Sequence, residues 1–222
     1  MTAYMIRLLI WTVFIAVLIF WPAGTLAYPG GWVFMIFMGL GGFIMIWWLA
    51  KVSPSLLRER MAAPWQRGQA SWDRVWLSLF VVLFCGWLAL MSWDAARTGF
   101  TAVPLWLQVV GVLAIIANYL GTWATFRENA FAAPVVKLQE NQKVIDTGPY
   151  AIVRHPMYTS ALCLFLGTPL AMGSWLGLAV GVVFCLALAW RAVHEENALR
   201  EGLPGYDAYM SRVCYRFIPF VW

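Results

Sequence analysis

The stretch Asp146-Thr-Gly-Pro-Tyr-Ala-Ile-Val-Arg-His-Pro-Met-Tyr158 and the segment Arg191-Ala-Val-His-Glu-Glu196 hold most of the polar groups of this chain that are suited to chemistry. They bracket two apolar runs, 157–172 and 174–190. With its flanking residues, each run is long enough to cross a bilayer as one arm of a helical hairpin. Membrane proteins keep ionisable residues where these face protein, a cofactor or water. We therefore interpret the two polar segments as the halves of one active site.

The composition indicates a membrane protein. Of the 222 residues, 63% are hydrophobic and 11% are charged, whereas a soluble domain has about 25% charged residues. This length accommodates five or six spans and their connections, with no room for a separate soluble domain. We predict an all-α, polytopic membrane protein with a C-terminal helical hairpin. We divide the chain into N-terminal transmembrane helices with a basic loop, 1–103, and a catalytic region, 104–222.

Four apolar runs precede the hairpin: Leu8–Trp21, Trp32–Ala50, Val75–Trp93 and Pro104–Phe126. Arg7 before the first run, and small residues after it, would also fit a signal peptide. We favour a retained helix, because the run is wide and aromatic and further spans follow at once. Small residues at Gly39–Gly42 favour close helix packing. For Asn118, inside the fourth run, we favour an interhelical hydrogen bond over a catalytic role.

The connections also carry structural signals. Ser53-Pro54 is typical of the start of a short surface helix, and a short loop, 94–103, is expected after the third run. In the second polar segment, Val135–Leu138 and Val144-Ile145 flank Glu-Asn-Gln. These residues form either a short hairpin or a loop that covers a cofactor. Thr147–Tyr150 indicates a turn.

Basic residues predict the orientation. With six spans, one side receives both termini and the segments 51–74 and 127–156, and these hold every lysine and arginine except Arg97. The positive-inside rule then makes both termini and the active site cytoplasmic. This orientation accounts for the net charge of +5, so we expect membrane lipid as a partner and no nucleic acid.

The sequence offers no pattern for a metal site. The four cysteines, Cys85, Cys163, Cys185 and Cys214, are not spaced as CxxC. His155 and His194 are the only histidines, and two imidazoles do not complete a site.

Arg191 and Glu195 are four residues apart and share a helix face, whereas Glu196 points about 100° away. Arg191 is suited to bind an anion, although a cation that snorkels to the interface has the same sequence signature. His155 is either a site residue or a helix cap. Tyr150 and Tyr158 are either interfacial anchors or part of a nucleoside pocket.

Taken together, these segments resemble the isoprenylcysteine carboxyl methyltransferase family, within a wider group that includes phospholipid N-methyltransferases. The resemblance covers about residues 104–222, and the set is specific in its order and spacing. The matching pattern is Gly148-x-Tyr150, Arg154-His-Pro-x-Tyr158, Arg191-x-x-x-Glu195-Glu196-x-x-Leu199, Gly205-x-x-x-Tyr209 and Ile218-Pro219.

The resemblance implies a methyltransferase that uses S-adenosylmethionine without a Rossmann domain. It implies that Arg191 is the catalytic residue that faces the acceptor. The cofactor-binding residues that it implies are Gln142, Lys143, Val144, Ile145, Tyr150, His155, Pro156, Met157, Tyr158 and Glu195. Leu203-Pro-Gly205 departs from the Phe-Gly of the eukaryotic enzymes, so recognition of a prenyl group does not carry over.

The expected acceptor is lipophilic or a small molecule that enters the membrane. A carboxylate or thiolate needs no strong base, whereas an amine needs a deprotonation route, for which Glu196 and His194 are weak candidates. Two alternatives remain open. One is an NADPH-dependent membrane reductase, because sterol reductases resemble this group in their C-terminal half. The other is a non-catalytic transporter, which predicts more polar residues near mid-span than Asn118.

Overall fold

The computed structural model describes residues 2–63, 65–99 and 102–222, and it contains no strand within them. The all-α prediction is confirmed. The helices are α1 (Thr2–Ala23), α2 (Pro29–Val52), α3 (Pro54–Arg60), α4 (Ser71–Ser92), the π-helix η1 (Trp93–Thr98), α5 (Leu105–Glu128), the 3₁₀-helix η2 (Gly148–Ala151), α6 (Pro156–Met172), α7 (Trp175–Gly202) and α8 (Tyr206–Arg212).

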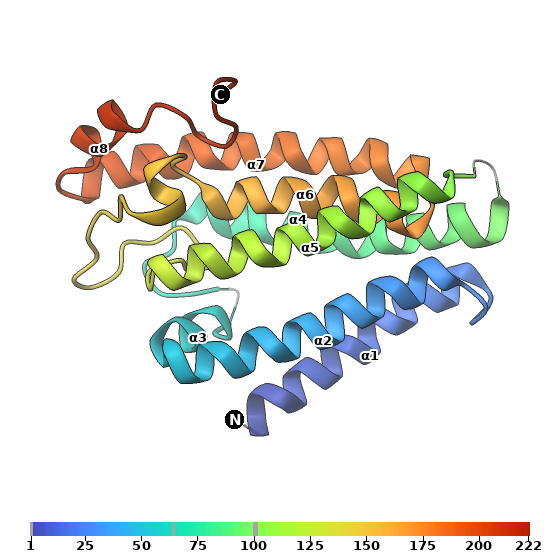
Figure 1. The fold of residues 1–222 in the computed structure, drawn as a ribbon. Coiled ribbons are helices and arrows are strands. Elements are labelled where there is room, and N and C mark those ends of the chain that lie inside the picture. The colour runs from blue at the N-terminus through green and yellow to red at the C-terminus, as the bar shows by residue number, and fades with distance from the viewer. Residues whose placement is uncertain (1, 64, 100–101) are drawn as a thin grey trace.

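The long helices run back and forth along one bundle (Figure 1). Five of them are long and apolar enough to cross a membrane: α1, α2, the continuous helix α4–η1, α5 and α7. The sixth, α6, has 17 residues and is also apolar. The chain is therefore a multi-pass membrane protein.

Helix α6 reaches the same end of the bundle as the α1–α2 connection. The Tyr28 hydroxyl donates a 2.6 Å hydrogen bond to the carbonyl oxygen of Met172, the last residue of α6. A Cβ atom on Gly30 would lie 2.9 Å from the Met172 backbone. Helices α6 and α7 are therefore both full-length arms of the predicted hairpin, joined by a turn at Gly173, which has a φ of 87°.

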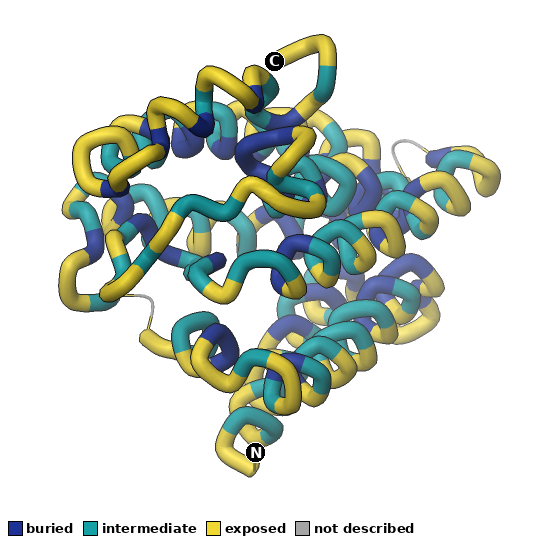
Figure 2. Tube along the Cα trace, turned by 60° about the vertical axis from the view of Figure 1, so that its left-hand side comes forward, coloured by how far each residue is buried: buried dark blue, intermediate teal, exposed yellow. Residues whose placement is uncertain are grey.

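Apolar side chains cover the outer surface of the bundle. In α1, Leu9, Ile10, Val13 and Val17 are all more than half exposed, and exposed positions recur along this helix in Figure 2. The same helix buries Ile15 and Ile19 in the core. In water such a surface would cost free energy in proportion to its apolar area, so these faces are suited to contact lipid.

Glycines set the closest helix contacts. A Cβ atom on Gly111 of α5 would overlap the backbone of Gly167 and Ala171 on α6. In the predicted Gly39–Gly42 packing motif, Gly41 lies against the ring of Tyr119, and Gly42 lies near Leu8. Close packing is thus found at Gly41 and Gly42, while a Cβ at Gly39 would meet nothing within 4 Å.

Two expectations differ from the structure. The π-helix η1 continues α4 to Thr98, whereas a loop was expected from residue 94, and buried Asp94 accepts a 2.6 Å hydrogen bond from the Ser174 hydroxyl there. The Asn118 side chain has no hydrogen-bond partner among the described residues, so the expected interhelical bond is not present there. Helix α7 continues to Gly202, in agreement with the helix face expected to carry Arg191 and Glu195.

All basic residues except Arg97 belong to one end of the bundle. This end holds α3, the α5–α6 connection and α8, on the left of Figure 1. As expected from Ser53-Pro54, a short helix, α3, begins at Pro54, and it buries Leu56 and Leu57. The polar segments are therefore gathered at one end of the molecule.

Candidate active site

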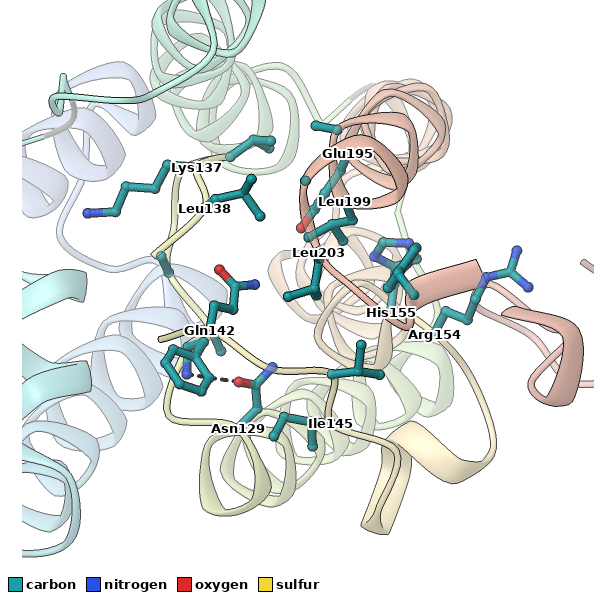
Figure 3. Close-up of a pocket in the computed structure, with 18 of the residues that line it drawn as sticks. Asn129, Lys137, Leu138, Gln142, Ile145, Arg154, His155, Glu195, Leu199 and Leu203 are labelled. Atoms are coloured by element: carbon teal, nitrogen blue, oxygen red, sulfur yellow. Dashed lines mark hydrogen bonds between the residues drawn. The ribbon is translucent and has the colours of Figure 1, made fainter. Parts of the chain in front are cut away.

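A cavity of about 390 Å³ lies at this end, between the α5–α6 connection and the C-terminal part of α7. Its volume lies within the range of small-molecule sites, about 300–1,000 Å³. Across it, Glu195 and Leu199 on α7, and Leu203 directly after this helix, face Leu138, Gln142 and Ile145 on the connection (Figure 3).

The cavity brings together most of the residues predicted to bind the cofactor. Those that line it are Gln142, Lys143, Val144, Ile145, Tyr150, His155, Met157, Tyr158 and Glu195. Pro156 does not line the cavity, because it is buried as the first residue of α6. Arg191 does not line it either. Its guanidinium carbon lies 5.9 Å from the centre of the ring of Tyr158, which does line the cavity.

The α5–α6 connection forms a loop over the cavity, and no strand forms in it. Polar side chains fold this loop on itself. The Gln139 amide group donates a 2.7 Å hydrogen bond to the Phe131 carbonyl oxygen, and Gln142 accepts a 2.9 Å hydrogen bond from the Gln139 backbone. Of the two forms left open by the sequence, the covering loop is the one observed.

The start of α6 is held by the C-terminal segment. The backbone N–H of Arg154 donates to the Tyr215 carbonyl oxygen, and that of His155 donates to the Arg216 carbonyl oxygen, both at 2.9 Å. This pairing fixes the backbone of residues 154–155 immediately before Pro156, the first residue of α6. The His155 ring consequently lies parallel to the Tyr158 ring, with 5.2 Å between their centres.

Glu196 holds this arrangement from α7. Its carboxylate accepts hydrogen bonds from Arg154 at 2.7 Å and from Arg216 at 2.8 Å, and it lies 3.2 Å from His155 Nε2. The residue is 2% exposed. The Arg154 side chain points away from the cavity centre, toward this carboxylate (Figure 3). Glu196 thus acts as a buried anchor on the far side of His155.

Glu195 has a different environment. It lines the cavity and accepts a 2.6 Å hydrogen bond from the Tyr158 hydroxyl. This bond joins the start of α6 to the C-terminal part of α7, which are the two polar segments identified in the sequence. The two segments thus meet at the cavity, and that they form one active site stays a prediction.

Tyr150 closes the cavity beside the loop. Its hydroxyl accepts a 2.8 Å hydrogen bond from the Asn129 side chain, and its carbonyl oxygen accepts one at 2.8 Å from the Tyr209 hydroxyl on α8. Burial raises the pKa of Tyr150 to about 12. The phenol is therefore neutral at physiological pH and acts as a hydrogen-bonding wall.

Several lining residues were not predicted: Gly68, Ala70, Asn129, Leu138, Leu199, Leu203, Tyr206 and Tyr209. Leu199 and Tyr209 belong to the motifs quoted above, so the sequence did contain a signal that could have identified them as lining residues. Gly68 and Ala70 precede α4, so residues before 103 contribute to the cavity.

Arg60 of α3 lies beside the cavity. It donates a 2.9 Å hydrogen bond to the carbonyl oxygen of Ala132, a lining residue, and burial lowers the pKa of Arg60 to about 10.

The residues that line the cavity fit a nucleoside cofactor that carries charged groups. Apolar walls from Val144, Ile145 and Leu203 suit a flat ring, and Gln142 and Asn129 offer amide groups. The Glu195 carboxylate offers a negative charge for a sulfonium or an ammonium group. No group in this set conflicts with such a ligand.

Comparison with known proteins supports this assignment. A search of curated proteins found no match to the chain. Residues 98–203, however, match the model of the family described as phospholipid methyltransferase, and this region holds α5, η2, α6, α7 and most of the cavity lining. The match agrees with the relationship indicated by the motifs: residues 98–203 are similar to the phospholipid methyltransferase family, which supports a membrane methyltransferase.

Proposed function

We propose that the chain transfers a methyl group from S-adenosylmethionine to a lipophilic or small acceptor that enters from the membrane. The main support is the Tyr158–Glu195 hydrogen bond of 2.6 Å, because it joins the two polar segments at a cavity of suitable size. The cofactor supplies an electrophilic methyl group on a sulfonium sulfur.

The residues proposed to hold it are Gln142–Ile145, Tyr150, His155, Met157, Tyr158 and Glu195. In this assignment the Glu195 carboxylate pairs with the positive charge, and Tyr158 orients Glu195. Pro156 acts indirectly by starting α6. Catalysis then consists of orienting two reactants and excluding water.

Each turnover breaks the bond between sulfur and the methyl carbon and forms one from that carbon to the acceptor. The electron pair of the broken bond stays on sulfur, which leaves S-adenosylhomocysteine as the product. A carboxylate or thiolate acceptor is left with no proton to remove. Arg191 is the cation proposed to hold such an anion, and its Nη1 has no hydrogen-bond partner among the described residues.

An amine acceptor would need a base, and the two earlier candidates are poorly placed for that role. Glu196 is buried and already bound by two arginines. His194 is outside the cavity lining, with Nδ1 2.9 Å from the Trp190 carbonyl oxygen. We therefore favour a carboxylate or thiol acceptor, as in isoprenylcysteine carboxyl methyltransferases.

The proposal extends to the organisation of the chain. We propose that the basic end, with both termini and the cavity, faces the cytoplasm, where the cofactor is available. We also propose that residues 104–222 form the catalytic region, and that residues 1–103 form N-terminal transmembrane helices and a basic loop, which contributes Gly68 and Ala70 to the cavity.

Calorimetry with S-adenosylhomocysteine on purified protein in detergent tests the cofactor. Wild-type protein should bind it, and His155→Ala or Glu195→Ala should weaken binding. No binding to folded wild-type protein would reject the assignment. Thermal stabilisation distinguishes the reductase alternative, since a ligand at 100 times its dissociation constant adds about 2.7 kcal/mol. S-adenosylhomocysteine should stabilise the protein and NADPH should not.

A labelled-methyl transfer assay identifies the acceptor. Native lipid extract and a panel of thiols and carboxylates serve as acceptors, with an amine lipid for comparison. Label on a carboxylate or thiol supports the proposal. Label on the amine lipid alone would replace the proposed acceptor class.

A further inference from the structure

Asp73 is a fully buried carboxylate in the first turn of α4, with an exposure of 0%. Its Oδ1 accepts a hydrogen bond from Arg191 Nε, and its Oδ2 accepts from the Gln69 side chain and the Val136 backbone N–H, all at 2.9 Å. A buried charge is tolerated when it is paired and hydrogen-bonded in this way. The carboxylate therefore joins α4, α7 and the covering loop.

Two further hydrogen bonds hold the covering loop next to Asp73. The Val136 carbonyl oxygen accepts from the Ala70 N–H at 3.1 Å, and Arg191 Nη2 donates to the Pro134 carbonyl oxygen at 2.8 Å. Val135, Val136 and Ala70 line the cavity. The loop wall at 134–136 is thus fixed by Asp73 and by the arginine that Asp73 holds.

The orientation of Arg191 depends on the same carboxylate. Its guanidinium carbon lies 4.7 Å from the centre of the Trp76 ring and 5.9 Å from that of the Tyr158 ring. Asp73 and Pro134 occupy the Nε and Nη2 groups. Nη1 has no hydrogen-bond partner among the described residues, so the fork keeps one donor group that neither Asp73 nor Pro134 uses.

We propose that Asp73 is a positioning residue for methyl transfer. It aims Arg191 at the acceptor and fixes the wall 134–136 around the cofactor. This inference rests on the proposed function. Asp73 precedes the region that matches the family, 98–203, so the family match does not assign it a role. One buried carboxylate then serves both reactants, and its loss affects both.

Asp73→Asn tests the proposal. Asparagine has nearly the same volume, but it offers one acceptor oxygen and a donor amide in place of two acceptor oxygens. We expect kcat to fall by roughly 10²-fold, as when a positioned charge is lost from a site that contains little water. We expect the affinity for S-adenosylhomocysteine to fall about tenfold, since the loop loses a hydrogen bond to a charged group.

Asp94→Asn is the matched control. Asp94 is also a buried aspartate of the same continuous helix, with an exposure of 1%, and it pairs with Ser174 at the opposite end of the bundle. This variant should keep kcat and the affinity for S-adenosylhomocysteine within a few fold of wild type. If Asp94→Asn lowered kcat and the affinity for S-adenosylhomocysteine as much as Asp73→Asn does, Asp73 would have only a general structural role, and the proposal would be overturned.

Comparison with Arg191→Gln separates the two effects. That variant should lose kcat but weaken S-adenosylhomocysteine binding by only a few fold, less than Asp73→Asn does, because the bond to Pro134 is lost while Asp73 still holds Val136. The double variant Asp73→Asn/Arg191→Gln should have a kcat no lower than the worse single variant, since the residues act as a unit. A kcat equal to the product of the two single losses would contradict a role through Arg191.

The double variant also covers the case in which Asp73→Asn does not fold. Removing both charges leaves no unpaired ion in the interior, which is the main cost of the single change. Its affinity for S-adenosylhomocysteine should still be lower than that of Arg191→Gln, and equal affinities would overturn the proposal. Wild-type protein that fails to bind S-adenosylhomocysteine would instead reject the proposed function itself.

Discussion

Glu195 and Glu196 are neighbours in the chain, but their carboxylates belong to different networks. Glu195 faces the cavity and accepts a hydrogen bond from Tyr158 at 2.6 Å. Glu196 is buried behind His155 and pairs with Arg154 at 2.7 Å. The turn of about 100° between successive helix residues separates them. One glutamate thus lines the cavity, and the other is buried in an ion-pair network beside it.

This separation predicts opposite effects for two matched changes. Glu196→Gln removes the charge that neutralises Arg154 and Arg216, so we expect it to lower the free energy of unfolding by about 3 kcal/mol. Glu195→Gln should change stability much less but weaken binding of S-adenosylhomocysteine. Thermal unfolding in detergent and calorimetry measure the two effects. Equal losses of stability in both variants would contradict separate roles.

The hairpin and its polar ends were predictable from the sequence because their signals are local. The lengths of the apolar runs predicted the spans, Gly173-Ser174 predicted the turn of the hairpin, and Pro156 predicted the start of α6. The end of α4 was not predictable in this way. The helix continues through a polar residue, Asp94, whose partner Ser174 is distant in the chain.

The site was predictable to the extent that its residues lie in motifs. Tyr158 and Glu195 belong to the quoted pattern, and they do meet at the cavity. Asp73 gave no comparable signal, because its value depends on Arg191, which is 118 positions away in the chain. A lone aspartate before an apolar run looks like an ordinary helix N-terminus. Its role becomes visible only when α4 and α7 are packed together.

The contact between α5 and α6 depends on small residues. Gly111→Ala places a methyl group against the backbone of Gly167 and Ala171, which cannot move aside as a side chain can. We expect a loss of about 1–3 kcal/mol in stability, as for other overpacked contacts. Gly39→Ala is the control, because a Cβ there meets nothing within 4 Å, and it should be neutral or slightly stabilising. Similar melting temperatures for the two variants would refute this view of the contact.

The orientation has a direct test. A reporter fused after Trp222 should be cytoplasmic, and one inserted at Gly99 should be external, because positive charge is retained on the cytoplasmic side. Arg97 is the lone basic residue at the Gly99 end of the bundle. Reporters that fall on the same side would mean that the number of crossings between these two points is wrong by one.

Tyr158→Phe removes the hydroxyl that holds Glu195 without changing the shape of the ring. We expect S-adenosylhomocysteine to bind about tenfold more weakly, since hydrogen bonds to charged groups contribute roughly 1.5–3 kcal/mol. Tyr119→Phe is a control on α5. It removes a 2.8 Å hydrogen bond to the Phe37 carbonyl oxygen away from the cavity, and it should not change ligand affinity. Unchanged affinity in Tyr158→Phe would show that this hydroxyl does not position Glu195 for binding.

Arg191 provides the test of how the acceptor is held. It lies on the same face of α7 as Glu195, one turn nearer the apolar part of the helix, so under the proposed function an acceptor from the bilayer would reach Arg191 first. The guanidinium donates hydrogen bonds from Nε to Asp73 and from Nη2 to the Pro134 carbonyl oxygen. Nη1 is therefore the group proposed to bind the anion. A lysine ammonium is a point charge and cannot bind the two protein groups in this fork geometry and the acceptor at once.

We therefore expect Arg191→Ala and Arg191→Lys to lose methyl transfer by roughly 10²–10³-fold. Both variants should retain S-adenosylhomocysteine affinity within a few fold, because the carboxylate of Asp73 still holds Val136. Transfer assays and calorimetry on the same preparations separate the two quantities. Loss of cofactor binding in a folded Arg191→Ala protein would move Arg191 into the cofactor site. Full activity in Arg191→Lys would mean that a single positive charge is sufficient and that the planar fork is not needed.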